Sequence, residues 1–285
     1  MNTPVVHDRN ADQAAYWNGP AGQRWIKRQE TQEIVLGPAS AALFERALAR
    51  EGIRVIDIGC GCGETTIALA KRVGRKGHVT GVDISAPMLA RARERADTGL
   101  PLNFVLADAT VHPFEPGRAD VVTSRFGVMF FAEPAVSFVN IRKALRPGGR
   151  LVFACWQEPR RNPWMMLPLQ SAYKHVPRLP EVGPEDPGPF SFAREDRVRR
   201  ILREASFSSI AMEPIELMLD IAAGGGLDAA VNSALSIGPV SRALEGQPPD
   251  LISAATNSMR AALGPLEKAN SVMLGAAIWI ASASA

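Results

Sequence analysis

The pattern of apolar and polar positions predicts repeated strand–helix pairs through the middle of the chain. Short runs rich in Val, Ile and Leu alternate with longer stretches of helical periodicity, which is typical of parallel βαβ units. A doubly wound α/β sheet is therefore expected. The expected strands are 54–58, 78–83, 102–107, 119–124 and 150–156, and helices are expected at 65–73, 85–96 and 133–145.

The pattern changes on either side of this region. Helices are expected over 12–30 and 38–50, a proline-rich stretch with one helix (164–173) over 160–188, a helix over 195–204, and strands over 210–219 and 272–283. Between those last strands, Gly238-Pro239 and Pro248-Pro249 divide 224–263 into two or three helices. We expect one domain, 1–285, with these parts: an N-terminal helical lid (1–50), a cofactor-binding core (51–157), a lid or substrate loop (158–193) and a C-terminal part of the sheet (194–285) that carries a helical insertion (224–263).

Composition and charge narrow the class of protein. A hydrophobic fraction of 46% suffices for a large core, and the formal net charge is only +3. Nucleic-acid binders usually gather their basic residues on one face, whereas the densest run here, 91–95, is interrupted by Ala92 and Glu94. We expect no nucleic-acid partner, and we expect the protein to bind or act on a small molecule. A monomer and a homodimer both stay open.

The three cysteines and the apolar runs bear on the compartment. Cys60 and Cys62 flank one glycine, so they are too close for ordinary disulfide geometry, and Cys155 is far from both in sequence. No histidine stands at metal-ligand spacing, so no metal is expected. The first ten residues do not resemble a signal peptide, and no apolar run reaches the roughly 20 residues of a spanning helix. We expect a cytoplasmic protein without a membrane span.

The most informative motif is the glycine turn Asp57-Ile-Gly-Cys-Gly-Cys-Gly63, which runs straight into a helix. It follows the first strand, and open α/β sheets bind ligands at the carboxyl ends of their strands. Gly59, Gly61 and Gly63 remove side chains where a ligand must approach the backbone. Three alternate glycines after a strand ending near an aspartate favour a nucleotide-like ligand over a structural turn.

The spacing indicates which ligand fits. The dinucleotide motif is G-x-G-x-x-G, whereas this turn is G-x-G-x-G followed by Glu64. A carboxylate at the start of the helix repels a pyrophosphate. S-adenosyl-L-methionine has no phosphate, and Asp57 can face its cationic amino acid end. We therefore expect this cofactor, with S-adenosyl-L-homocysteine as its product.

Two further carboxylates follow the next strands. Asp83 ends the second strand and can accept hydrogen bonds from both ribose hydroxyls, although a nicotinamide cofactor would use the same contact. Asp108 follows the third strand and can hold the adenine amino group, with small Ala109 leaving room for the ring. For Asp108 a turn or helix-capping role is the alternative.

Four segments together resemble the class I S-adenosylmethionine-dependent methyltransferases, and in style the ubiquinone/menaquinone C-methyltransferase-like group. These segments are 57–63, Gly81-Val-Asp-Ile-Ser85, Ala107-Asp-Ala109 and Leu145-Arg-Pro-Gly-Gly-Arg-Leu151. The resemblance implies a Rossmann-like methyltransferase fold: a seven-stranded, mostly parallel sheet with the last strand antiparallel. The connection between 210–219 and 272–283 is longer than the usual hairpin, so 224–263 is either a substrate element or a dimer element.

The loop after the fourth strand, Ser124 to Phe131, is expected beside the methyl group. Gly127 allows a close approach, while Arg125 needs a partner, which is the cofactor carboxylate, a substrate acid or an internal aspartate. We expect the N-terminal segment 16–25 and the segment 162–175 to close over the acceptor. The expected cofactor contacts are Asp57, Gly59, Cys60, Gly61, Gly63, Thr65, Asp83, Ile84, Met88, Asp108, Ala109, Arg125, Phe126 and Trp25, and the expected substrate contacts are Tyr16, Trp17, Met129, Phe130 and Trp164.

Methyl transfer needs alignment of the nucleophile above all, and a general base only for some acceptors. His112 and His175 are the candidate catalytic bases. Methyl transfer to an O, C or N atom of a small molecule is the favoured function. Methylation of RNA, DNA or protein, a non-catalytic cofactor-binding protein and a nicotinamide dehydrogenase are the alternatives.

Overall fold

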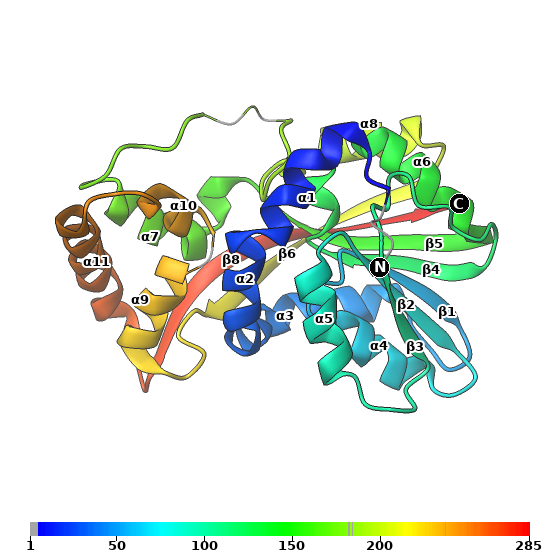
Figure 1. Cartoon of the computed structure of the whole chain (residues 1–285), viewed down its shortest axis with the longest axis horizontal. Coiled ribbons are helices and arrows are strands. Elements are labelled where there is room, and N and C mark those ends of the chain that lie inside the picture. The colour runs from blue at the N-terminus through cyan, green and yellow to red at the C-terminus, as the bar shows by residue number, and fades with distance from the viewer. Residues whose placement is uncertain (1–4, 182, 184, 237) are drawn as a thin grey trace.

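The computed structural model describes residues 5–181, 183, 185–236 and 238–285. Its strands are β1 (Arg54–Ile58), β2 (His78–Asp83), β3 (Leu102–Leu106), β4 (Ala119–Arg125), β5 (Leu145–Trp156), β6 (Ser208–Asp220), β7 (Glu267–Lys268) and β8 (Ser271–Ser284). Seven of them form one sheet in the order β3-β2-β1-β4-β5-β8-β6, while the two-residue β7 pairs only with β8 (Figure 1). Strands β1 to β5 pair in parallel, and β8 is antiparallel to both β5 and β6. The expected mostly parallel sheet with an antiparallel last strand is confirmed.

Helices cover both faces of the sheet. Those of the sheet region are α3 (Gln29–Ala47), α4 (Glu64–Val73), α5 (Ala86–Arg95), α6 (Pro134–Ala144) and α8 (Glu195–Glu204). On one face, Phe44 of α3 and Leu69 of α4 share a buried cluster with Val55 and Val79. Helices α6 and α8 lie on the other face (Figure 1). Phe138 of α6 and Leu202 of α8 belong to the main core. The loops that bear the motifs follow the carboxyl ends of β1, β2 and β4.

The N-terminal region differs from the expected helices 12–30 and 38–50. It forms α1 (Ala11–Asn18), α2 (Pro20–Lys27) and then α3. The break falls at Gly19, which is extended because a residue before proline disfavours the helical region, and Pro20 opens the next helix. Helix α3 then continues through Pro38 instead of beginning there. The expected boundaries here were wrong, because tertiary packing of α3 on the sheet outweighs one lost hydrogen bond.

Four helices form a second layer beyond the ends of β6 and β8, away from β1 to β3 (Figure 1). This helical cap consists of α7 (Pro163–Ala172), α9 (Gly226–Ser236), α10 (Pro239–Leu244) and α11 (Pro249–Leu263). Leu169 of α7 packs with Val240 of α10 and Met259 of α11. The stretch around α7 and the insertion after β6 therefore share one small core. The insertion holds three helices, the upper of the two numbers expected.

None of the helices in the described ranges is long and apolar enough to cross a membrane.

Candidate functional site

The glycine turn connects β1 to α4 in a left-handed backbone. Gly59, Gly61 and Gly63 have φ values of +67°, +55° and +85°. A Cβ at Gly59 would lie 2.7 Å from the Cα of Gly127, in the loop after β4, and one at Gly63 would lie 2.9 Å from the Cβ of Ala92. The glycines at 59 and 63 are thus also required by the protein's own packing, which the sequence argument from ligand contact did not foresee.

Asp57 lies under this turn and is fully buried. Its Oδ2 accepts hydrogen bonds from the hydroxyls of Thr65 (2.5 Å) and Thr66 (2.7 Å). Its Oδ1 has no hydrogen-bond partner among the described residues. Burial raises the pKa of this carboxyl to about 6, although the threonine hydroxyls oppose the shift. A buried carboxylate with a free oxygen beside the turn matches the cationic end of an amino acid. Thr65, an expected cofactor contact, supports Asp57.

Asp83, at the end of β2, also forms a hydrogen bond with the glycine turn. Its Oδ2 accepts the Gly61 N–H at 2.7 Å and its Oδ1 accepts the Ser85 N–H at 2.8 Å. Burial raises the pKa of Asp83, while these backbone donors lower it. Each carboxylate oxygen keeps one further acceptor direction for a ribose hydroxyl. The structure brings Asp57, Asp83 and the three glycines together, as expected.

The neighbours of Asp83 fix the start of α5. Ser85 caps that helix by accepting the Met88 N–H. The Cε of buried Met88 would lie 2.9 Å from a Cβ at Gly61, and the carbonyl of Ile84 accepts the Asn18 side chain at 3.0 Å. Cys60 is buried under the turn.

Asp108, after β3, has partners from the N-terminal segment. Asn10 Nδ2 lies within 3.0 Å of both carboxylate oxygens, and the His7 and Thr110 N–H groups each donate to one of them at 2.9 Å. Asp108 is therefore the anchor of the N-terminal segment in this structure, instead of offering free oxygens to an adenine. Ala109 beside it is buried. The sequence analysis missed Asn10, which is 3% exposed and also accepts the Ala132 N–H at 3.1 Å.

Arg125, at the end of β4, forms an ion pair with Glu64, the first residue of α4. The Arg125 side chain also donates to the hydroxyl of Ser40 on α3 at 2.7 Å. The partner that Arg125 needs is thus internal, and it is a glutamate instead of an aspartate. This pairing occupies Arg125 and neutralises the charge of Glu64 beside the turn.

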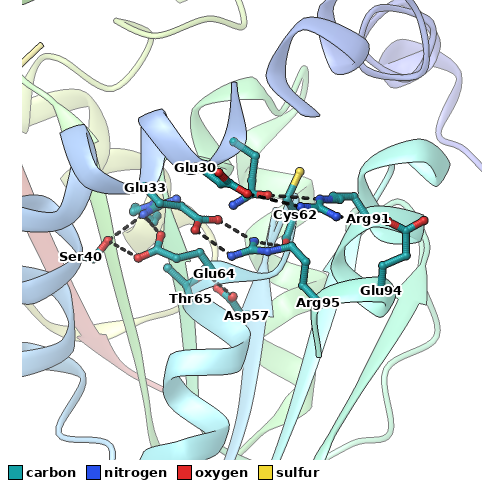
Figure 2. A network of polar contacts seen from close by, with 12 residues as sticks. Glu30, Glu33, Ser40, Asp57, Cys62, Glu64, Thr65, Arg91, Glu94 and Arg95 are labelled. Carbon is teal, nitrogen blue, oxygen red and sulfur yellow. Dashed lines mark hydrogen bonds and ion pairs between the residues drawn. The ribbon is translucent and has the colours of Figure 1, made fainter. Parts of the chain in front are cut away.

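A second ion pair fixes α3 over the turn. Arg95 of α5 binds Glu33 of α3 at 2.6 Å and also donates to the carbonyl of Cys62 at 2.7 Å. Figure 2 shows Glu33 with its partner Arg95, and places Glu33, Ser40 and Glu64 close together around the start of α4. Helix α3 is therefore held rigidly against the glycine turn.

The aromatic residues fall into two groups. Trp17 packs edge-on against Tyr16 (5.1 Å between ring centroids), Trp25 (6.3 Å) and Phe130 (5.2 Å). This group links α1 and α2 to the loop after β4. Met129 is buried, and its carbonyl accepts the Ser191 hydroxyl at 2.6 Å. Met129, an expected substrate contact, therefore belongs to the hydrophobic core.

The second aromatic group starts at Phe126, which has a φ of +66°. Phe126 stacks on Trp156 with centroids 4.1 Å apart, and Trp156 contacts Trp164 of α7 at 5.0 Å. Phe126 directly precedes Gly127, so this group runs from the glycine turn toward the helical cap.

The two candidate histidines lie apart from these groups. The His112 ring packs edge-on against Phe114 and lines a hollow at the amino ends of β1 and β2, with Arg54 and His78. Burial lowers the pKa of His112. His175 follows α7, and its Nε2 lies 2.6 Å from the Ser258 hydroxyl on α11. The structure brings neither histidine to the glycine turn.

A cavity that no sequence pattern indicated lies between α3 and the helical cap. Its volume is about 50 Å³, and it opens into a larger hollow that is continuous with solvent. Its lining comes from α3, α7, α9, α10 and the segment after β6, and comprises Gln32, Val35, Trp164, Met165, Pro168, Ile221, Ser233, Ala234, Gly238, Pro239 and Val240. Of these, only Trp164 was predicted as a substrate contact.

Comparison with known proteins adds to this geometry. A family described as "Methyltransferase domain" matches residues 55–149, which hold the glycine turn and the strands around it. This part of the chain therefore resembles a methyltransferase domain. The chain is similar to a demethylmenaquinone methyltransferase of Staphylococcus aureus, with 38% identity over 36% of this chain and 43% of that protein. It therefore spans less than half the length of that relative.

Other comparisons cover more of the chain. The ubiquinone/menaquinone biosynthesis C-methyltransferase UbiE of Shewanella piezotolerans is 26% identical over 59% of this chain and 71% of that protein. A putative methyltransferase from Bacillus halodurans C-125 shares the fold, with a TM-score of 0.55 at 17% identity over 87% of this chain and 99% of that one. The [4+2]-cyclase SpnF also shares it, with a TM-score of 0.53 at 17% identity over 99% and 98%. The fold by itself therefore does not define the reaction.

Proposed function

We propose that this chain binds S-adenosyl-L-methionine at the glycine turn and transfers its methyl group to a small-molecule acceptor, with S-adenosyl-L-homocysteine as the product. The observation that carries the proposal is the buried Oδ1 of Asp57 beside Gly59 and Gly61, which has no hydrogen-bond partner in the described part of the chain. A buried carboxylate oxygen without a donor is unfavourable, so a cationic ligand group at this place is favoured. The demethylmenaquinone and ubiquinone/menaquinone relatives support a small-molecule acceptor.

The chain's own residues would hold the cofactor as follows. Asp57 faces its ammonium group, Asp83 accepts from the ribose hydroxyls, and Gly61 allows the backbone to approach. The bound cofactor supplies a methyl group on a positively charged sulfur, which the acceptor displaces in line. Phe126 and Gly127 lie at the end of β4 and border the reacting region. They exclude water and align the acceptor, which is the main requirement of this reaction.

We propose that neither candidate histidine takes a proton from the acceptor. His112 and His175 are occupied in other parts of the molecule, at the amino ends of the strands and in the helical cap. We propose that catalysis depends chiefly on the positioning of the acceptor. This suits an acceptor group that is acidic enough to lose its proton without a general base.

We also propose a cytoplasmic protein without a nucleic-acid partner, in a monomeric or homodimeric state. Cys60, Cys62 and Cys155 are free and buried, and burial raises the pKa of each thiol. Free cysteines suit a reducing compartment. The near balance of charge supports the small-molecule acceptor.

The direct test is calorimetry with three ligands. We expect S-adenosyl-L-methionine and S-adenosyl-L-homocysteine to bind at about micromolar strength, where the free energy is about −8 kcal/mol, and NAD to give no heat. NAD binding without S-adenosyl-L-homocysteine binding would contradict the proposal. Cofactor binding with no turnover on any acceptor would instead indicate a non-catalytic binding protein.

The N-terminal segment gives a second expected result. Because Asn10 holds this segment on Asp108, Asn10→Ala should leave buried partners unsatisfied and loosen α1 and α2. We expect faster amide hydrogen exchange over residues 16–25, by roughly tenfold for a loss of about 1.4 kcal/mol in local opening, and unchanged exchange in β1 and β4. Asn103→Ala, which removes a partner of His78 and Thr80, is the matched control. Equal exchange in the two variants would mean that Asn10 does not hold the segment.

Ligand should protect the same segment. We expect S-adenosyl-L-homocysteine to slow exchange over 16–25. Helix α7 should change less than the sequence alone predicts for a lid, because Asn162 fixes its start to the sheet through the Ala277 N–H (3.0 Å) and the Gln157 carbonyl (3.0 Å).

A further inference from the structure

The cavity under the helical cap combines an apolar lining with a few polar groups. Its side chains are mainly aliphatic or aromatic, and the lining residues with polar side-chain atoms are Gln32, Ser233 and Trp164. None of the described residues that line it is charged. Burying a charged ligand without a partner is strongly unfavourable, so the lining selects a neutral molecule.

The polar groups show where such a molecule would be recognised. The Nε1 of Trp164 is buried and has no hydrogen-bond partner among the residues that the structure describes. Gln32 is 4% exposed, and its Nε2 lies 3.4 Å from the Ser233 hydroxyl, which is a long contact. Trp Nε1 can only donate, and a buried indole N–H usually finds a partner. The missing partner is therefore a hydrogen-bond acceptor.

The cavity is also connected to the reacting region. Trp164 contacts Trp156, and Trp156 stacks on Phe126. The next residue, Gly127, lies against Gly59 of the glycine turn. A continuous aromatic wall thus leads from the turn to the cavity.

We propose that this cavity is the acceptor site, and that it takes a neutral, largely apolar molecule whose oxygen accepts a hydrogen bond from Trp164 Nε1. The helices α9 and α10 of the insertion then select the substrate, and α3, held by Glu33 and Ser40, forms the rigid wall. This inference rests on the proposed methyl transfer, because it assigns the acceptor of that reaction. Pockets of this kind, apolar with few oriented polar groups, are the usual form of small-molecule sites.

The test uses three single-ring probes of one shape: acetophenone, ethylbenzene and benzoate. They are titrated into protein with ¹⁵N-labelled tryptophan, both without and with saturating S-adenosyl-L-homocysteine. The chain has five tryptophans, so each indole N–H resonance can be assigned by substitution. We expect acetophenone to shift the Trp164 indole N–H resonance downfield. Ethylbenzene should bind without this downfield shift, and benzoate should bind at least about tenfold more weakly than acetophenone.

Trp164→Phe should weaken acetophenone binding about twofold to tenfold, the range for one neutral hydrogen bond, and should leave ethylbenzene binding nearly unchanged. Trp279→Phe is the matched control, because Trp279 Nε1 already donates to the Ala193 carbonyl at 2.8 Å. If Trp164→Phe does not fold, Ala234→Leu, which narrows the cavity, should weaken both neutral probes.

An unshifted Trp164 resonance, or equal loss in Trp164→Phe and Trp279→Phe, would overturn the assignment. Preferred binding of benzoate would overturn it as well. Failure of the proposed function is seen separately, as the absence of S-adenosyl-L-homocysteine binding in calorimetry. If the probes bind in the cavity but no cofactor binds, the cavity is a ligand site and the proposed methyl transfer is wrong.

Discussion

Replacing Asp83 with alanine is expected to weaken S-adenosyl-L-homocysteine binding about tenfold to a hundredfold, the range for hydrogen bonds to a charged group worth about 1.5–3 kcal/mol. The carboxylate would lose the ribose hydroxyls, and the Gly61 and Ser85 N–H groups would lose their acceptor. The sequence alone predicts little effect on the fold. The structure adds a fall in the free energy of unfolding, because the Gly61 N–H loses its only recorded acceptor among the described residues. Calorimetry gives the affinity and denaturant unfolding gives the stability.

Asp120 offers a matched control for this change. It also stands on a strand and accepts a backbone N–H, from Arg54 at 2.8 Å, together with the Arg146 side chain at 2.6 Å. Asp120→Ala should reduce stability without changing the dissociation constant. If Asp83→Ala leaves the dissociation constant unchanged, the ribose lies elsewhere. If both variants weaken binding equally, the effect is a general loss of stability.

Local patterns predicted the strands best. The bounds of β1 and β2 match the expectation because each is a short β-branched run that ends at a turn or a charged residue. Strand β5 begins earlier than expected, at Leu145, because the chain pairs again with β4 across the irregularity at Pro147-Gly148-Gly149. The break at Gly19-Pro20 had a local signal, the proline itself, whereas the passage of α3 through Pro38 depends on packing that a local pattern does not contain.

For the site too, features that depend on local sequence were predicted, and features that depend on tertiary packing were not. Asp57, Asp83 and the three glycines come together because they follow adjacent parallel strands, which the topology fixes. Asn10 and Asp108 are separated by 98 residues, and nothing around Asn10 distinguishes it from a surface asparagine. Arg125 was identified as needing a partner, but the choice of Glu64 depends on how α4 starts relative to β4. The cap cavity required the packing of α7 on the insertion, which likewise has no local signal.

Asp57→Asn is expected to weaken cofactor binding about tenfold to a hundredfold near neutral pH, because the cofactor's ammonium group would lose its charged partner. In the wild type the affinity should also depend on pH. The pKa of Asp57 is raised to about 6 by burial, so the carboxyl is largely neutral below that pH and ionised above it. A cation binds the ionised form, so affinity should rise by about tenfold between about pH 5 and pH 7, with release of one proton on binding at low pH.

The stability of the cofactor-free protein changes with pH in the opposite direction to the cofactor affinity. The pKa of Asp57 in the folded protein lies above its ordinary value of about 4, so the folded state holds the proton more tightly and the free protein loses stability as pH rises from about 4 through 6. Asp57→Asn removes this loss. Without cofactor the variant should be at least as stable as the wild type above about pH 7, although its affinity is lower.

The charged groups near Asp57 do not remove this pH dependence. The positive charge of Arg125 lowers the pKa of Asp57 and the negative charge of Glu64 raises it, and these two side chains are paired with each other. Calorimetry of S-adenosyl-L-homocysteine at four pH values, in two buffers of different ionisation enthalpy, measures both the affinity and the released proton. Asp120→Asn serves as the control and should keep the wild-type profile. A flat wild-type profile, or the same slope in Asp57→Asn, would show that Asp57 does not contact the ammonium group of the cofactor.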